Sequence, residues 1–316
     1  SHQCSPWVSD YAVYSFMPMV GELVVNQDAR ATKFSHDNEI AKPHYYKVTF
    51  DNDITTEMAP TTRGVHLRFS YPTTGDAYLV LDGYTDMSEI KIDPAKRQIS
   101  GWVNNQRFVN DSKSFRNYFV VQFDKPFEDY GVWENQKDEV FPQKLDGAGK
   151  GYGAFIKFKK GSKVQAKAAS SYISAEQALI TLNKELGKDK NLEVTKARGQ
   201  KTWNEVLNRI VVEGCTDEQM KTFYSCLFRA NLFSRKFYER KENGEPYYYS
   251  PYNGKIYDGY MYTDNGFWDT FRSQFPLTNI LHPTMQGRYM NALLAAQEQC
   301  GWLPSWSSPG ETGGML

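Results

Sequence analysis

Short runs of β-branched and aromatic residues, separated by turn signals, occupy the first half of this chain and constrain its fold more than any other feature. Residues of these types favour extended backbone. The runs are Tyr45–Phe50, Ile54–Met58, Val65–Tyr71, Ala77–Asp82, Ile99–Val103, Asn117–Phe123 and Gly151–Phe158. Turn sequences such as Asp51-Asn52-Asp53 and Pro72-Thr73-Thr74-Gly75 stand between them. Because no helical pattern interrupts the runs, residues 1–168 are predicted to form an antiparallel β-sandwich.

Helical patterns replace the strand patterns near Ser171. Ser174-Ala175-Glu176-Gln177 is a capping box, and apolar residues at helical spacing follow it as far as Leu186, before Gly187. A polar loop then leads to a second helical stretch, expected from Lys201 to Glu213. Residues 169–215 are therefore predicted to be a helical linker.

The last third of the chain alternates helices with long polar-aromatic loops. A capping box at Thr216 opens one helix, and Pro283 opens another that should end before Gly301. Such an alternation is how a helical barrel builds a site at one end. Three or four helices cannot close a barrel, so residues 216–316 are predicted to be its beginning, with the helical domain continuing beyond residue 316.

Composition and charge exclude several classes of partner. The chain has 316 residues, a formal net charge of +0 and 40% hydrophobic residues, which indicates a globular protein rather than a nucleic-acid or anionic-membrane binder. No apolar run is long enough to span a membrane. Cys4, Cys215, Cys226 and Cys300 lack metal-ligand spacing, and the helical positions of Cys226 and Cys300 predict buried free thiols.

The stretch Asp264–Arg272 concentrates chemistry-bearing residues. It holds two carboxylates, an amide, aromatic rings and a guanidinium, and a second polar-aromatic run follows at 301–312. Rings stack on the apolar face of a sugar, while charged and amide groups fix its hydroxyls, so a carbohydrate cleft is indicated. Two plainer interpretations remain open: Trp268 could be core, and Asp269 and Arg272 could form only an ion pair on a helix surface.

Several segments, taken in order, resemble glycoside hydrolase family 92. His2-Gln3-Cys4-Ser5-Pro6-Trp7-Val8-Ser9-Asp10-Tyr11 is similar to the family's H-Q-x-S-P-W-x-x-D-Y segment. Gly266-Phe267-Trp268-Asp269-Thr270-Phe271-Arg272 and Gly301-Trp302-Leu303-Pro304-Ser305-Trp306 also match. Further matches are Phe34–Glu39, Pro43–Tyr46 and Ser171–Ala178, so the resemblance covers nearly the whole chain.

The resemblance implies a fold and an activity. The fold is an α+β multidomain chain: an N-terminal antiparallel β-sandwich with its first strands missing, a helical linker and the start of an (α/α)6 barrel. The activity is that of an exo-acting α-mannosidase, with α-1,2-linked mannose of N-glycans or mannans as the expected substrate. Family members invert the anomeric configuration with the help of calcium. The resemblance places the catalytic acid, the base and the calcium ligands after residue 316, so neither catalytic residues nor metal ligands are assigned in this chain.

The substrate-binding candidates follow from the same resemblance. Trp7 is expected to reach the terminal-mannose subsite, and Asp269 would hold sugar hydroxyls as an ionised acceptor beside Arg272. Trp268, Trp306 and Glu311 are further candidates for the cleft, and Asp264 is expected to be a binding or supporting group.

Other polar residues are expected to be structural or exposed rather than metal ligands. His2, His36, His44, His66 and His282 lack zinc spacing. Asp51-Asn52-Asp53 and Asp93 lack the spacing of a calcium loop and are predicted to form ordinary turns.

Two other functions remain open from the sequence: a carbohydrate-binding fragment without turnover, and a phosphorylase or lyase of similar architecture. No signal peptide is visible, but Ser1-His2-Gln3 is unlike a natural start. A periplasmic or cell-surface location follows from the resemblance alone.

Overall fold

The computed structural model describes residues 11, 13–84, 86–104, 115–264 and 266–307. These residues separate into two compact units. We call the first the sandwich unit, which comprises residues 13–104 and 116–201, and the second the helical unit, which comprises residues 11, 115 and 202–307. The boundary between the two falls inside one helix, α2 (Leu192–Leu207).

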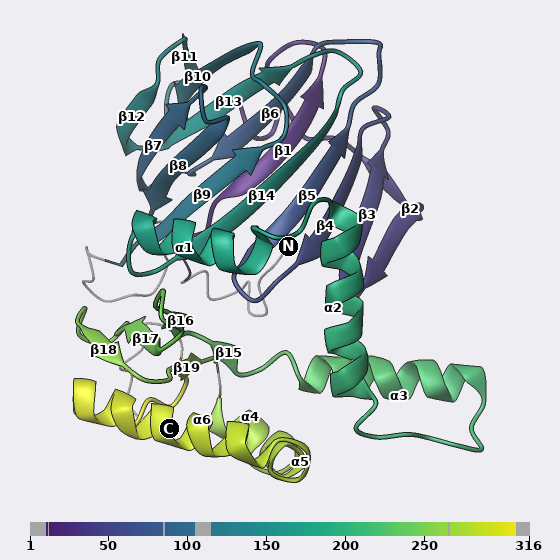
Figure 1. Ribbon diagram of the computed structural model, residues 1–316, viewed down its shortest axis with the longest axis vertical. Helices are drawn as coiled ribbons and strands as arrows, with labels where there is room; N and C mark the ends of the chain where they lie inside the picture. The colour runs from purple at the N-terminus through teal and green to yellow at the C-terminus, as the bar shows by residue number, and fades with distance from the viewer. Residues whose placement is uncertain (1–10, 12, 85, 105–114, 265, 308–316) are drawn as a thin grey trace. The chain divides into compact units, whose positions relative to one another are not determined.

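The sandwich unit is built from two antiparallel sheets (Figure 1). The smaller sheet has five strands in the order β1 (Ser15–Val20), β6 (Ala77–Asp82), β13 (Tyr152–Phe158), β10 (Asp129–Glu134) and β11 (Glu139–Pro142). The larger sheet has nine strands in the order β12 (Asp146–Lys150), β7 (Met87–Asp93), β8 (Gln98–Val103), β9 (Asn117–Phe123), β14 (Lys163–Ser171), β5 (Gly64–Ser70), β4 (Thr55–Pro60), β3 (Tyr45–Phe50) and β2 (Phe34–Lys42).

The core of this unit lies between the sheets. Phe123 of the larger sheet and Phe158 of the smaller sheet meet with ring centroids 5.6 Å apart. Trp133 is fully buried in a cluster with Met19 and Val80, and its indole N–H donates to the carbonyl of Leu81 over 3.1 Å. These strands therefore form the antiparallel sandwich that the sequence predicts.

Helix α1 (Ala175–Leu186) covers the larger sheet, where it packs on β14, β9 and β5 (Figure 1). The Ser174 hydroxyl accepts a hydrogen bond from the Gln177 backbone N–H over 3.1 Å, as the capping-box sequence predicts. Ala178 and Leu182 then pack on Val120 and Ala169 of the sheet.

Helix α2 begins earlier than the sequence pattern predicts. The expected helix was Lys201–Glu213, but α2 spans Leu192–Leu207. Leu192 packs against Tyr45 and Ala59 of the larger sheet. This tertiary contact stabilises a first turn whose own sequence is weakly amphipathic. Both predicted ends of the second helix were therefore wrong, whereas the polar loop at 188–191 precedes α2 as expected.

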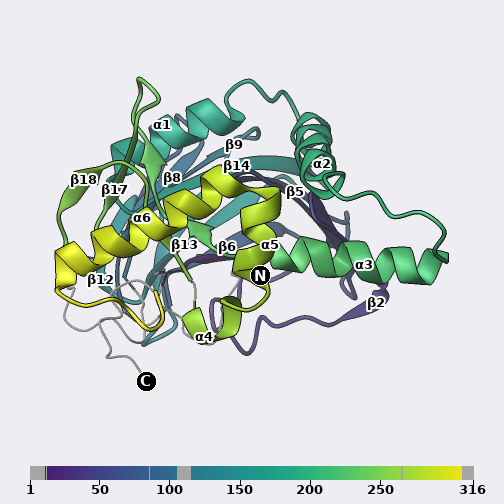
Figure 2. The same cartoon turned by 90° about the horizontal axis from the view of Figure 1, so that it is seen from below.

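The helical unit contains α3 (Asp217–Ala230), the short α4 (Phe267–Thr270), α5 (Gln274–Leu281) and α6 (Pro283–Cys300). Figure 2 shows α5 leading into α6. Thr216 and Gln219 complete a reciprocal capping box at α3. Gly301 ends α6 with φ +86°, a conformation that glycine adopts without a steric penalty, so both predicted ends of this helix are confirmed.

Two small sheets complete the helical unit. β15 (Arg235–Lys236) pairs with β19 (Tyr262–Thr263), and β16 (Glu239–Arg240), β17 (Pro246–Tyr249) and β18 (Ile256–Asp258) form a three-stranded sheet. The aromatic stretch at 247–254, predicted to be a loop, therefore begins as a strand. Paired strands satisfy the backbone groups of this Tyr-rich segment.

The cysteine prediction is corrected in part. Cys215, Cys226 and Cys300 are free thiols, as expected for Cys226 and Cys300. Cys226, however, is exposed on α3 and Cys300 is only half-buried, so the expectation of buried thiols was wrong. Cys4 lies outside the described residues. In the described part of the chain, no helix has the length and apolar character needed to cross a membrane.

Candidate functional site

A two-stranded ribbon organises the candidate site. In β15 and β19, Arg235 pairs with Thr263 and Lys236 pairs with Tyr262. Because successive side chains of a strand point to opposite faces, Arg235 and Thr263 share one face, and Lys236 and Tyr262 share the other. The first face carries a buried polar cluster that leads directly into the Asp264–Arg272 stretch.

This buried cluster consists of Tyr11, Arg235, Thr263 and Asp264. The Tyr11 hydroxyl donates to the Asp264 carboxylate over 2.5 Å and lies 2.7 Å from the Thr263 hydroxyl. Arg235 donates from Nε to the second Asp264 oxygen over 2.9 Å, and its guanidinium lies 3.9 Å from the centre of the Tyr11 ring. Tyr11 and Asp264 are each only 2% exposed. The carboxylate is therefore held from both sides by donors.

Burial dominates the electrostatics of the cluster. It raises the pKa of Asp264, while the positive charge of Arg235 and the hydrogen bonds from Tyr11 and Arg235 oppose that rise. Burial, together with the nearby Asp264 charge, also raises the pKa of Tyr11 well above its usual value, so Tyr11 is a neutral donor. Because its oxygens are already engaged, Asp264 serves as an anchor rather than as an exposed acid.

The cluster fixes the start of the central stretch. Asp264 adopts φ +66°, and its backbone N–H donates to the carbonyl of Ser307 over 2.9 Å. Gly266 forms an isolated β-bridge with Trp306. A Cβ at Gly266 would lie 2.2 Å from Cζ3 of Trp306, so only glycine allows the backbone to approach this ring. The two polar-aromatic runs of the sequence therefore meet.

Short helix α4 presents the remaining candidates. The Thr270 hydroxyl donates to the Gly266 carbonyl over 2.8 Å. Asp269 and Arg272 are both exposed, and among the described residues they form no ion pair with each other. The Arg272 guanidinium instead lies 5.1 Å from the Phe271 ring centre. The alternative of a simple helix-surface ion pair is thus not what the structure shows.

The other predicted residues differ in how far the structure places them. Trp306 is half-buried against Gly266. The backbone of Trp268 belongs to α4, but its side chain lies outside the described part of the structure. Trp7 and Glu311 also lie outside the described residues.

Sequence reasoning missed three residues of the site. Tyr11 closes the first motif, and its position there was the available signal. Arg235 and Thr263 carried no recognisable signal, because a single arginine or threonine beside aromatic residues fits any β-ribbon. Only strand pairing brings them to Asp264.

Among the described residues, no group of three or more His, Cys, Asp and Glu side chains is placed to hold a metal ion. His66 is buried and its Nδ1 lies 2.9 Å from the Thr195 hydroxyl, which agrees with a structural role.

Comparison with known proteins relates the chain to a family and to solved structures. The glycosyl hydrolase family 92 N-terminal domain matches residues 1–171, and the family's catalytic domain matches residues 177–316. No curated protein sequence matches the chain.

Solved structures extend the comparison. The family GH92 inverting mannosidase BT2199 from Bacteroides thetaiotaomicron VPI-5482 is 42% identical, with a TM-score of 0.94 over 100% of this chain and 42% of that chain. The family GH92 α-mannosidase BT3965 from Bacteroides thetaiotaomicron is 23% identical, with a TM-score of 0.81 over 94% of this chain and 42% of that chain. The GH92 family glycosyl hydrolase ccman5 is 22% identical, with a TM-score of 0.79 over 90% of this chain and 40% of that chain.

The chain thus spans about two fifths of the length of these relatives, at 42%, 42% and 40%. The two domain matches leave only residues 172–176 between them. The sandwich followed by helices agrees with the relatives' fold, and the motif residues are tied together by Tyr11 and Asp264. On this evidence the chain belongs to glycosyl hydrolase family 92.

Proposed function

We propose that the full-length protein containing this chain is an exo-acting α-mannosidase that releases terminal α-linked mannose, with α-1,2 linkages in N-glycans or mannans as the main substrate. The observation that carries this proposal is the 42% identity, over the entire chain, to a structure described as an inverting mannosidase. We extend the inverting outcome and calcium assistance to this protein on the same basis.

The binding roles rest on the geometry of the central stretch. Asp269 and Arg272 are exposed and are not consumed by an ion pair with each other, so both remain available to sugar hydroxyls. Trp306 offers an aromatic surface beside Gly266. Trp7, Trp268 and Glu311 complete the proposed set of binding residues. The Tyr11, Arg235 and Asp264 cluster positions this stretch without touching substrate.

The proton chemistry requires two carboxyl groups, which we place after residue 316. In an inverting glycosidase one acid protonates the leaving oxygen and one base activates water, with the two groups about 6.5–9.5 Å apart. Asp264 is not proposed for either role because it is buried and hydrogen-bonded. On the family resemblance, we also place the calcium ligands after residue 316.

Proton NMR of the full-length protein acting on α-1,2-mannobiose tests the activity. We expect release of mannose with the β-anomer appearing first, and loss of release in excess EDTA that added calcium restores. Release of α-mannose first would contradict inversion, and no release from any α-linked mannobiose with calcium present would contradict the proposed activity.

The binding role of Asp269 has its own test. Because Asp269→Asn weakens a charge-assisted hydrogen bond, kcat/KM should fall by at least about tenfold. Asp258→Asn is the matched control: Asp258 is exposed, and its ion pair with Lys241 at the surface contributes little. Equal kcat/KM for the two variants would contradict a substrate-binding role for Asp269.

One alternative is favoured by a specific observation. The described acid at the centre of the site, Asp264, is engaged by Tyr11 and Arg235, so the 316-residue chain by itself could bind mannosides without turnover. Turnover by a polypeptide whose mass ends at Leu316 would contradict this alternative.

We also propose export to the periplasm or cell surface, on the family resemblance. Fractionation of producing cells tests this location, and activity confined to the cytoplasmic fraction would contradict it.

A further inference from the structure

A column of four aromatic rings leads to the Asp264 anchor inside the helical unit. It runs from Tyr249 of β17 through Phe115 and Phe237 to Tyr11. The Phe115 ring stacks on Phe237 with centroids 6.4 Å and planes 11° apart, and it lies 5.9 Å from the Tyr249 ring. The Phe237 ring lies 6.4 Å from that of Tyr11. Aromatic rings attract one another at these separations.

Phe115 occupies an unusual position in the sequence for a residue of this unit. It lies between β8 and β9, two strands of the sandwich unit, and Arg116, which follows it, belongs to that unit. Phe115 itself belongs to the helical unit and is 0% exposed. Because a completely buried ring is surrounded by close-packed neighbours, Phe115 fills space that other residues of the helical unit leave beside Phe237 and Tyr249.

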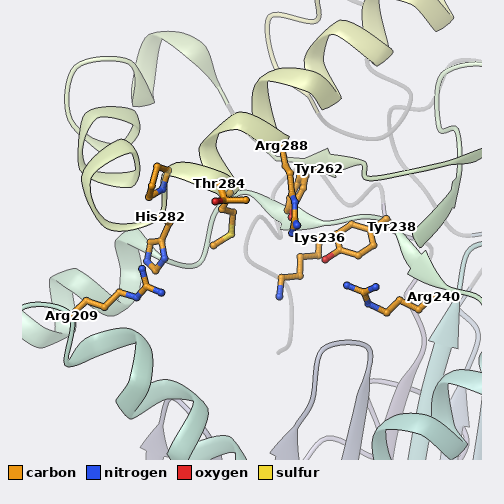
Figure 3. Close-up of a pocket in the computed structure, with 10 residues that line it drawn as sticks. Arg209, Lys236, Tyr238, Arg240, Tyr262, His282, Thr284 and Arg288 are labelled. Carbon is orange, nitrogen blue, oxygen red and sulfur yellow. The ribbon is translucent and has the colours of Figure 1, made fainter. Parts of the chain in front are cut away.

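Side chains in and after β15 alternate between two surroundings. Arg235 and Phe237 contact the Tyr11 ring. Lys236 and Tyr238 instead line the pocket shown in Figure 3. Such alternation is the geometry of extended backbone. Phe237 therefore shares its side of the segment with Arg235, which holds the anchor carboxylate.

The backbone gives Phe237 a second connection to the anchor. The Phe237 N–H donates to the carbonyl of Met261 over 2.9 Å, and Met261 is fully buried. Met261 is followed directly by β19 and then by Asp264. A displacement of Phe237 would therefore move the segment that leads into Asp264, because a close-packed core transmits shifts between neighbours.

We propose that Phe115 is a positioning residue of the candidate site. Through Phe237 and Tyr11, its ring fixes where Asp264 holds the central stretch, which carries proposed binding residues. The Asp264 backbone N–H also ties this stretch to the carbonyl of Ser307 in the second polar-aromatic run. The effect on mannose binding rests on the proposed function, whereas the coupling between Phe115 and Asp264 does not.

Phe115→Leu in the full-length protein tests this role, with Phe158→Leu as the matched control. Phe158 is also 0% exposed and also packs against aromatic rings, but those rings belong to the sandwich core. KM for α-1,2-mannobiose should rise by about tenfold in Phe115→Leu, because small displacements of binding groups weaken substrate binding. Its kcat should change by less than about twofold, since the proton-transferring groups are proposed to lie elsewhere. Phe158→Leu should leave both parameters unchanged.

Hydrogen exchange of the Asp264 amide gives a readout that does not require activity. The hydrogen bond to the Ser307 carbonyl protects this amide. Mass spectrometry of the peptide that contains it should show exchange at least about fivefold faster in Phe115→Leu than in the wild type or in Phe158→Leu. Phe115→Met is a second variant, whose flexible side chain fills the space without a ring, and it should give the same pattern.

The outcomes separate the positioning role from the proposed function. Faster exchange and a higher KM in the Phe115 variants alone support the positioning role. Equal changes in Phe115→Leu and Phe158→Leu would overturn it, and so would a change in only one of the two measurements when the wild type is active. If the wild type releases no mannose while exchange still responds only to Phe115, the proposed function fails and the coupling stands.

Discussion

The hydroxyl of Tyr11 donates to the carboxylate of Asp264 over 2.5 Å, joining two residues that are 253 positions apart in the chain. Tyr11 ends the H-Q-x-S-P-W-x-x-D-Y segment, and Asp264 begins the central stretch. The last residue of the first motif and the first residue of the central stretch are therefore joined inside the helical unit by a buried hydrogen bond. Arg235 completes the anchor on the other carboxylate oxygen.

Tyr11→Phe tests this anchor. The substitution keeps the ring beneath Arg235 but removes one donor from a buried carboxylate, so the free energy of unfolding should fall by about 1–3 kcal/mol. Urea denaturation followed by circular dichroism measures the change. Tyr118→Phe is the control, because no hydrogen bond to the Tyr118 hydroxyl occurs within the described residues. An equal decrease in the free energy of unfolding of both variants would show that the hydrogen bond from the Tyr11 hydroxyl does not stabilise the fold.

Asp264→Asn tests the consequence of burial for the pH dependence of stability. Burial raises the pKa of Asp264, so the folded protein binds this proton more tightly than the unfolded chain. The resulting stabilisation is present below the unfolded pKa of about 3.9 and is lost as pH rises through the folded pKa. The stability of the wild type relative to Asp264→Asn should therefore decrease as pH rises.

Asparagine is the right replacement because it tolerates the positive φ of this position. Urea denaturation from about pH 4 to pH 7 covers the window above the unfolded carboxyl pKa. A stability difference between wild type and variant that stays constant, or that grows in favour of the wild type with pH, would refute the expected direction.

His66→Gln addresses the sandwich unit. His66 is 1% exposed, and burial lowers its pKa to about 4. The folded state favours the neutral ring. The contribution of His66 to folding stability is therefore complete above the unfolded pKa of about 6.5 and is lost as pH falls through the folded pKa of about 4. As pH falls across this range, the free energy of unfolding of the wild type should decrease by on the order of 3 kcal/mol. That of His66→Gln should decrease by less.

His36→Gln is the control for this experiment, because the His36 side chain is 87% exposed. Thermal denaturation at several pH values measures both variants. If acid destabilised the His66 and His36 variants equally, the buried ring would not be the source of the pH dependence.

Gly266→Ala tests the close approach between the two polar-aromatic runs. A Cβ at this position would lie 2.2 Å from the Trp306 ring, so the substitution should cost about 1–3 kcal/mol through displaced packing and should lower mannose release. Gly287→Ala on α6 is matched to it, since a Cβ there meets nothing within 4 Å. Alanine in that helix should be neutral or should stabilise by up to about 1 kcal/mol. A Gly266→Ala protein with wild-type stability and activity would show that Trp306 moves freely.

Some elements were missed for an identifiable reason. Strand β14 lies at the centre of the nine-stranded sheet, yet the prediction ended the sandwich's strands at Phe158. Its Ala166, Ala168 and Ala169 have low β propensity, but all three are buried. The small side chain of Ala169 lets Ala178 and Leu182 of α1 pack closely on the sheet. Helix packing, which no local pattern encodes, overrides the propensity of this segment.

The sequence alone determined the order of elements and the family. Runs of β-branched and aromatic residues specify strands such as Asn117–Phe123, and capping residues such as Thr216 specify helix starts. The ordered motifs are local strings of residues. Tertiary structure decided which of those residues meet. Arg235 and Thr263 reach Asp264 only through strand pairing. Lys236 and Tyr262 lie on the opposite face of the ribbon because successive side chains of a strand alternate. Contacts between residues hundreds of positions apart depend on how the elements pack, which local patterns do not record.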